Sequence, residues 1–129
     1  MLKIIFYSLT LIFGAQSLAN SAQAHHSYAG YIRDESFELN GTIVDIQWRN
    51  PHILLVVNNG FENIRVEWVT VNGAEKTGVN PNQFTIGDPI TVIGSRNTNP
   101  EIHTMTMVKE LSMSEKNWHW ISPSLTRTP

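Results

Sequence analysis

Apolar and polar residues alternate over several short stretches of the chain, a pattern typical of half-buried β-strands. The longest stretch covers residues 37–48, and its apolar positions change phase beside Gly41, where we expect a β-bulge or a sharp bend. The Asn-Pro pair at 50–51 ends this strand, because proline has no N–H to donate to a sheet. The apolar run 53–57 predicts a second strand, and the Asn-Asn-Gly sequence at 58–60 predicts a hairpin turn after it.

Four further segments complete the predicted fold. Residues 64–68 alternate apolar and charged positions and predict a third strand, a short helical turn is expected at 73–77, and residues 90–94 and 103–111 predict two more strands. A long, bent first strand and a helix between strands 3 and 4 favour an all-β fold, a small five-stranded β-barrel of the OB type. A β-sandwich is the main alternative.

The amino-terminal segment has a different character. Lys3 precedes an apolar stretch at 4–13, and residues 22–24 read Ala-Gln-Ala, a small-x-small cleavage pattern. We therefore predict a signal peptide over 1–24, helical only in the precursor, and export to the periplasm or beyond. The stretch is shorter than the roughly 20 apolar residues of a membrane span, so no stable span is expected after cleavage. The alternatives are an uncleaved anchor and cleavage after Ala19.

The predicted mature chain has the size of one domain, with a barrel over 25–113 and a tail over 114–129 that shows no dependable period. It contains no cysteine, which excludes disulfides, thiolate zinc sites, iron–sulfur clusters and covalent haem attachment. The net charge is −2, whereas a nucleic-acid binder needs a strong positive field, so we expect no nucleic-acid partner.

The sequence also lacks the motifs of common catalytic sites. It has no Gly-x-Ser-x-Gly elbow, phosphate loop or His-Glu-x-x-His helix, and no carboxylates can be paired from the sequence. Enzyme activity is therefore not predicted.

Candidate chemistry lies in the histidines, all five of which follow the predicted cleavage site. Cleavage after Ala24 makes His25 the first residue, so its α-amine and its imidazole Nδ1 can chelate one metal ion. The ordinary pKa of an α-amine is about 7.7–8.0, so a metal can displace its proton near neutral pH. Nitrogen ligands favour Cu(II). The arrangement resembles the histidine brace of copper monooxygenases and of some periplasmic copper carriers.

Further imidazoles are needed to complete such a site. His52 is the best candidate, because it follows Pro51 at the start of a strand, where an amino-terminal arm could reach the barrel rim. The alternative is a solvated histidine in an Asn-Pro turn. His26 could be a third ligand or a supporting partner, although chain ends are usually disordered and His25-His26 could form an exposed stub.

His103 is a further candidate ligand. It alternates with Met105 and Met107, so the three side chains are expected on one face of a strand, and thioethers beside an imidazole suit Cu(I). Methionines that fill the core are the alternative. His119 is expected to have a packing or surface role.

Several motifs together resemble a family of small exported bacterial proteins classed as a domain of unknown function. The most specific are His-His-Ser at 25–27 and Trp-Arg-Asn-Pro-His at 48–52. Others follow in the same order: Gly-Thr-Ile at 41–43, Val-Glu-Trp at 66–68 and Gly-Asp-Pro-Ile-Thr-Val at 87–92. The chain departs at 74–78, where the family has a clearer Leu-x-Arg-x-Gly stretch, and the Trp-His-Trp tail lies outside the match. The resemblance implies an exported β-barrel of unassigned function.

These observations predict an exported metal-binding protein or carrier that holds copper through His25 and His52, assisted by His26 or His103. Its partners would be the metal ion and a periplasmic protein. The main alternative is a metal-free, OB-like binding module for a small ligand or a protein. A copper-dependent oxidase is less favoured, because so short a chain leaves little surface for a substrate site.

Overall fold

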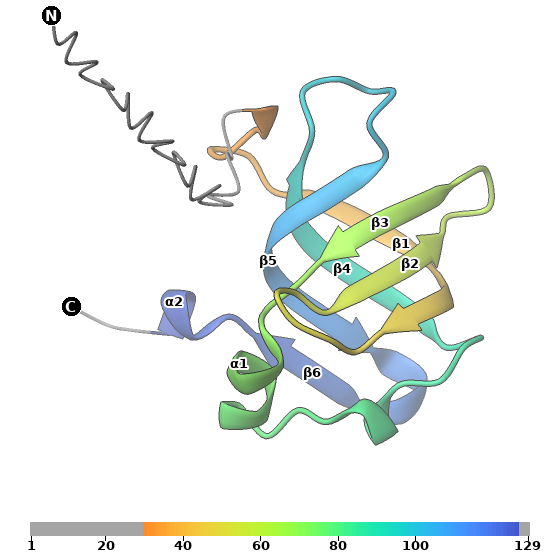
Figure 1. The fold of residues 1–129 in the computed structure, drawn as a ribbon. Helices are drawn as coiled ribbons and strands as arrows, with labels where there is room; N and C mark the ends of the chain where they lie inside the picture. The colour runs from red at the N-terminus through yellow and green to blue at the C-terminus, as the bar shows by residue number, and fades with distance from the viewer. Residues whose placement is uncertain (1–29, 127–129) are drawn as a thin grey trace, which may run out of the picture.

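The computed structural model describes residues 30–126 (Figure 1). The predicted signal peptide and His25-His26 lie outside these residues. The elements in chain order are β1 (Phe37–Gln47), β2 (Leu54–Asn58), β3 (Asn63–Glu67), α1 (Val71–Lys76), β4 (Pro89–Arg96), β5 (Thr104–Met113), β6 (Trp118–Ile121) and α2 (Pro123–Thr126), with single 3-10 turns at Pro81–Gln83 and Ser114–Lys116.

The strands form a closed barrel. Their order is β3-β2-β1-β4-β5-β6, and β3 also pairs with β5 in parallel, through Arg65 opposite Thr104 and Val66 opposite Met105. This pairing closes five strands into a barrel with α1 between the third and fourth, which confirms the predicted OB-like fold. Within the described part of the chain, no helix is long and apolar enough to cross a membrane.

The bend in β1 lies further along the strand than the sequence predicts. The pairing of β1 with β2 shifts between Ile43 and Asp45, so the extra residue is Val44 and not a neighbour of Gly41. Ile43 is fully buried, whereas Val44 is 39% exposed. Gly41 has a different role, because its missing side chain lets β1 approach the Asn58 backbone closely.

The carboxy-terminal segment adds a sixth strand that the sequence pattern does not reveal. β6 pairs with β5, with Trp120 opposite Leu111. The Trp120 ring is buried and meets Trp68 edge to face at 5.0 Å, and its Nε1 donates to Thr77 Oγ1 at 3.1 Å. The four-residue strand is too short for its alternation to stand out from the loops beside it.

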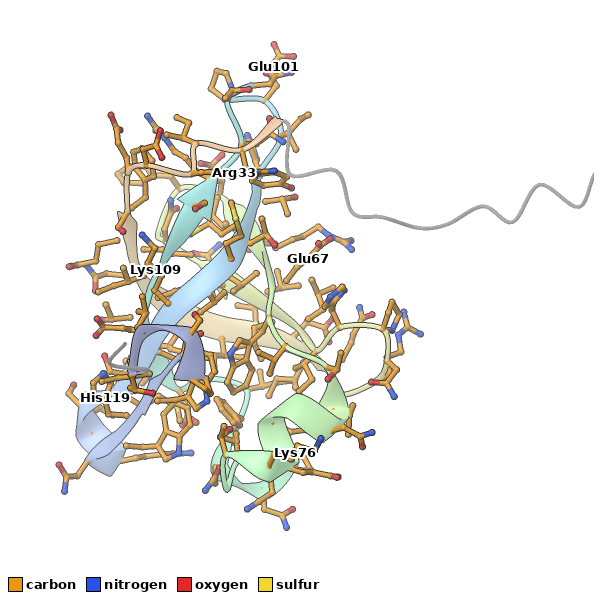
Figure 2. The ribbon with its side chains drawn as sticks, turned by 90° about the vertical axis from the view of Figure 1, so that its left-hand side faces the viewer. Arg33, Glu67, Lys76, Glu101, Lys109 and His119 are labelled. Atoms are coloured by element: carbon orange, nitrogen blue, oxygen red, sulfur yellow. The ribbon has the colours of Figure 1, made fainter. Side chains whose placement is uncertain are left out.

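The two ends of the barrel differ. Aromatic rings pack together near α1, with centroids 5.0–6.2 Å apart, and fill one end: Trp48, Trp68, Phe84, Trp118 and Trp120. Figure 2 shows Lys76 of α1 at this end and Glu101, in the β4–β5 loop, at the opposite end. The interior of the barrel is therefore filled at the aromatic end.

Helix α1 begins two residues earlier than predicted. Its N-cap is Thr70, whose Oγ1 accepts a hydrogen bond from Gly73 N at 3.0 Å. We expect Thr70→Ala to lower the free energy of unfolding by about 1 kcal/mol, because one helical N–H loses its acceptor. Urea unfolding measures this, with Asn72→Ala as the control, since the Asn72 side chain is exposed and makes no cap. Equal losses in the two variants would contradict the assignment.

Candidate binding sites at the barrel mouth and beside His52

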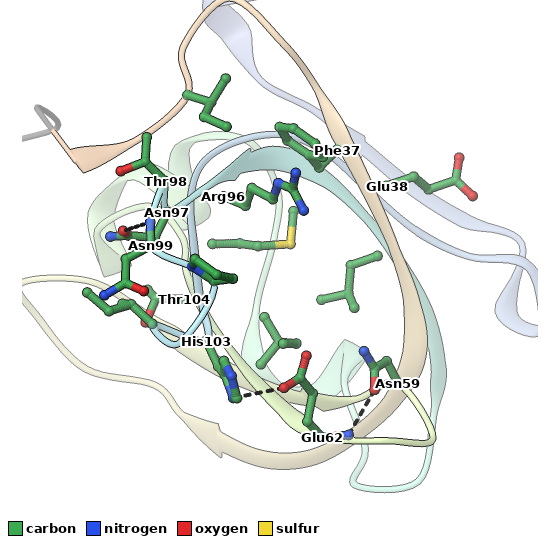
Figure 3. Close-up of a pocket in the computed structure, with 16 residues that line it drawn as sticks. Phe37, Glu38, Asn59, Glu62, Arg96, Asn97, Thr98, Asn99, His103 and Thr104 are labelled. Carbon is green, nitrogen blue, oxygen red and sulfur yellow. Dashed lines mark hydrogen bonds and ion pairs between the residues drawn. The ribbon is translucent and has the colours of Figure 1, made fainter.

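A cavity of about 440 Å³ opens at the end of the barrel away from the aromatic rings (Figure 3). We call it the mouth cleft. Its walls come from the start of β1, the start of β3, the end of β4, the β4–β5 loop and the start of β5. The apolar lining residues are Ile32, Phe37, Leu39, Ile64, Pro100, Ile102 and Met105.

Arg96 is the arginine that lines the mouth cleft. Its guanidinium carbon lies 4.1 Å from the centroid of the Phe37 ring, a cation–π contact that holds the charged group against the cleft wall. Among residues 30–126, no carboxylate lies within ion-pair distance of this guanidinium. The cleft therefore contains a fixed positive charge beside apolar surface.

His103 stands at the rim of the mouth cleft, just before β5. Its Nδ1 lies 2.9 Å from Glu62 Oε2, and both side chains are about two-fifths exposed. Arg65 N donates to the His103 carbonyl oxygen at 2.9 Å, so the backbone here is also fixed. An exposed pair of this kind adds little stability, but it orients the ring.

A second hollow, of about 370 Å³, lies beside His52, and we call it the His52 hollow. It is shallower than the mouth cleft and shares no lining residue with it. His52 precedes β2, and the hollow extends over the end of β3, the start of α1 and the middle of β5. The other lining residues are Trp68, Val69, Thr70, Gly73, Thr106, Met107 and Val108.

Met107 reaches the His52 hollow because β5 is irregular. The pairing of β4 with β5 shifts between Ile93 and Ser95, and Met107 has a φ of 46° in the left-handed region. Such a conformation costs a non-glycine residue roughly 1–2 kcal/mol. The bulge breaks the alternation of β5, so Met105 is buried at the mouth cleft while Met107 lines the His52 hollow. The expectation that His103, Met105 and Met107 share one face is therefore wrong.

The predicted ligands are thus distributed over separate places. His52 and His103 line different cavities, and within residues 30–126 no three His, Cys, Asp or Glu side chains are grouped as for a metal ion. His25 and His26 lie outside the described residues. His119 is on β6, exposed, with Nε2 3.3 Å from Glu110 Oε2, and it lines neither cavity (Figure 2). Of the packing and surface roles predicted for it, the exposed position fits the surface role.

The sequence analysis did not predict the contacts of the charged residues that line the mouth cleft. Arg96 follows a predicted strand and Phe37 begins another, but nothing in the sequence indicates that they meet. Glu62 likewise follows a predicted turn and reaches His103 only because β3 pairs with β5. Both contacts depend on pairings between strands that are far apart in the sequence, and such pairings leave no local pattern that could have revealed them.

The protein is therefore a small OB-like β-barrel whose mouth cleft has apolar walls and one arginine, Arg96. Residues 14–107 match a family of unknown function (DUF6152), and the chain belongs to this family. None of the curated proteins matches it in sequence.

Solved structures offer distant likenesses. The Stn1–Ten1 complex of S. pombe is 12% identical with a TM-score of 0.47, over 63% of this chain and 62% of that one. A complex of TiaS with a tRNA and ATP is 13% identical with a TM-score of 0.46, over 64% and 18%. A ZRD-deleted TiaS with agmatine is 15% identical with a TM-score of 0.49, over 75% and 28%. The chain thus spans less than two thirds of each of these structures, and likenesses of this size say nothing about its ligand.

Proposed function

We propose that the chain is exported, loses residues 1–24, and then binds or carries copper. The proposed ligands are the α-amine and imidazole of His25, the imidazole of His52 and the thioether of Met107, with His26 assisting. His103 lies outside this set, because it lines the other cavity.

The observation that carries the proposal is that His52 and Met107 line the same hollow. An imidazole suits both Cu(II) and Cu(I), and a thioether adds affinity for Cu(I). These two residues are 55 positions apart in the chain, and both line the hollow because β5 contains a bulge at Met107. Bulges commonly re-aim a side chain toward a functional site.

The path of the amino-terminal arm supports the involvement of His25. The Gly30 carbonyl oxygen accepts hydrogen bonds from Thr98 N at 2.8 Å and Thr98 Oγ1 at 3.1 Å, and Tyr31 bridges Asn97. These contacts fix the arm at the end of β4, the neighbour of β5. Four residues separate Gly30 from His25, so the five steps between them span at most about 18 Å. We propose that His25 crosses β5 toward the hollow within this reach.

Two buried polar atoms that have no hydrogen-bond partner within residues 30–126, both near the His52 hollow, also support a functional site there. Of the buried side-chain polar atoms in residues 30–126, Trp68 Nε1 and Ser95 Oγ have no hydrogen-bond partner. Trp68 lines the hollow, and Ser95 pairs with Thr106, the residue before Met107. Backbone strain and unpaired polar groups are costly to keep and cluster at functional sites.

The proposed function is tested by titrating the secreted, processed protein with Cu(II) against a competing chelator. We expect His52→Gln to weaken binding by about tenfold or more, because removal even of an outer-shell partner costs roughly 10–100-fold. His103→Gln is the matched control and is expected to leave the affinity within about twofold of the wild type. Equal affinities in wild type and His52→Gln would overturn the proposed site.

A second candidate function is metal-free binding of a small ligand, and the mouth cleft favours it. The cleft has a volume of about 440 Å³, within the range of about 300–1,000 Å³ that is usual for small-molecule sites. Its lining combines apolar side chains with a few polar groups, which is also typical of such sites.

A further inference from the structure

We propose that the mouth cleft binds a small carboxylate with an apolar body, its carboxylate held by Arg96; this inference rests on the second candidate function and is independent of copper.

The apolar part of the ligand is inferred from the cleft walls. Phe37 and Leu39 of β1, Ile64 of β3 and Met105 of β5 line the cavity from three directions. Leu39, Ile64 and Met105 are among the buried core residues, so the cleft extends into the barrel core and not merely over its rim. An apolar chain or ring that enters this space loses its contact with water, which favours binding.

The sign of the ligand's charge is inferred from the charged groups around the cleft. Two carboxylates line it, and both have partners: Glu62 pairs with His103, and Glu38 Oε1 accepts from Asn40 Nδ2 at 2.6 Å. In Figure 3 the Glu38 carboxylate points away from the cavity, whereas the Arg96 guanidinium lies within the ring of strands. Both carboxylates keep their charge, but Glu38 points out of the cavity and Glu62 is bonded to His103, so Arg96 is the charged group that faces the interior of the cleft.

The Arg96–Phe37 contact favours a carboxylate over a neutral group of the same shape. The Phe37 ring lies 4.1 Å from the guanidinium carbon and restricts the movement of the charged group, so less freedom is lost when a ligand binds. A planar guanidinium can donate two parallel N–H bonds to a carboxylate. A carboxylate that entered the apolar cleft without this partner would be strongly disfavoured.

The experiment uses octanoate as the probe and octanamide as its neutral match, in the presence of EDTA to exclude metals. Binding to the processed protein is followed by calorimetry and by amide NMR shifts. We expect octanoate to bind in the millimolar range or tighter and to shift signals of residues that line the mouth cleft. Octanamide is expected to bind about tenfold more weakly, because it cannot form the charge-assisted hydrogen bonds that a carboxylate accepts from Arg96.

Two variants separate the possible outcomes. Arg96→Gln is expected to reduce octanoate affinity about tenfold and to leave octanamide affinity unchanged. Arg49→Gln makes the same charge change at an exposed residue outside the cleft, and it is expected to affect neither probe.

If both probes bind equally to wild type, Arg96 does not select a carboxylate and the inference fails while the second candidate function stands. If neither probe shifts cleft residues at millimolar concentration, both fail.

Discussion

Gly41→Ala is expected to lower the free energy of unfolding by about 3 kcal/mol, the upper end of the usual cost of overpacking. A Cβ at this position would overlap the Asn58 carbonyl oxygen and lie 2.7 Å from Val57 Cγ1. The obstructing carbonyl is backbone, so no rotamer change relieves the overlap. β1 would have to move away from β2 and weaken the ladder on one side of the barrel.

Urea unfolding of the processed protein measures this effect, and Thr42→Ala is the matched control. Thr42 is the next residue of the same strand and its side chain is exposed, so its substitution is expected to change stability by about 0.5 kcal/mol or less. A Gly41→Ala protein as stable as the Thr42→Ala protein would show that the two strands are not packed as closely as described.

One glycine added before His25 is expected to reduce the Cu(II) affinity on the order of a hundredfold or more. Loss of a residue that only supports a ligand costs roughly 10–100-fold, and loss of a direct ligand is expected to cost more. The added residue converts the His25 α-amine into an amide, so the chelate ring made by that amine and the His25 imidazole no longer forms. The five-residue arm before Gly30 is otherwise unchanged, so the fold and the His52 hollow should be unaffected.

The same glycine added after Pro129 is the control and is expected to leave the affinity unchanged. Mass spectrometry of the secreted protein must first show that it begins at His25. A mature chain that begins at Asn20, or equal affinities in the two extended proteins, would contradict a role for the α-amine.

The fold could be predicted because its signals are local. Alternation over β1 and β3, the apolar run of β2 and the turn at 58–60 each need only a few neighbouring residues. The position of the β1 bulge and the existence of β6 could not be predicted in this way. The bulge at Val44 depends on pairing with β2, and β6 forms because Trp120 packs on Trp68 and bonds Thr77.

The candidate sites were predicted only in part. The place of His52 before a strand follows from Asn50-Pro51, and the structure agrees. Its neighbour Met107 could not be anticipated, because a strand pattern places Met107 with Met105, and only the left-handed φ of 46° separates them. Arg96 and Phe37 come together through the β1–β4 pairing, which no spacing in the sequence encodes.

The central claim is that a copper ion is held by the first residue of the processed chain together with His52. Pulsed EPR of the Cu(II) protein tests it most directly, because the remote nitrogen of each coordinated imidazole modulates the echo. We predict modulation from at least two imidazoles in the wild type and from one fewer in His52→Gln, with His103→Gln unchanged. An identical imidazole count in wild type and His52→Gln would contradict the claim.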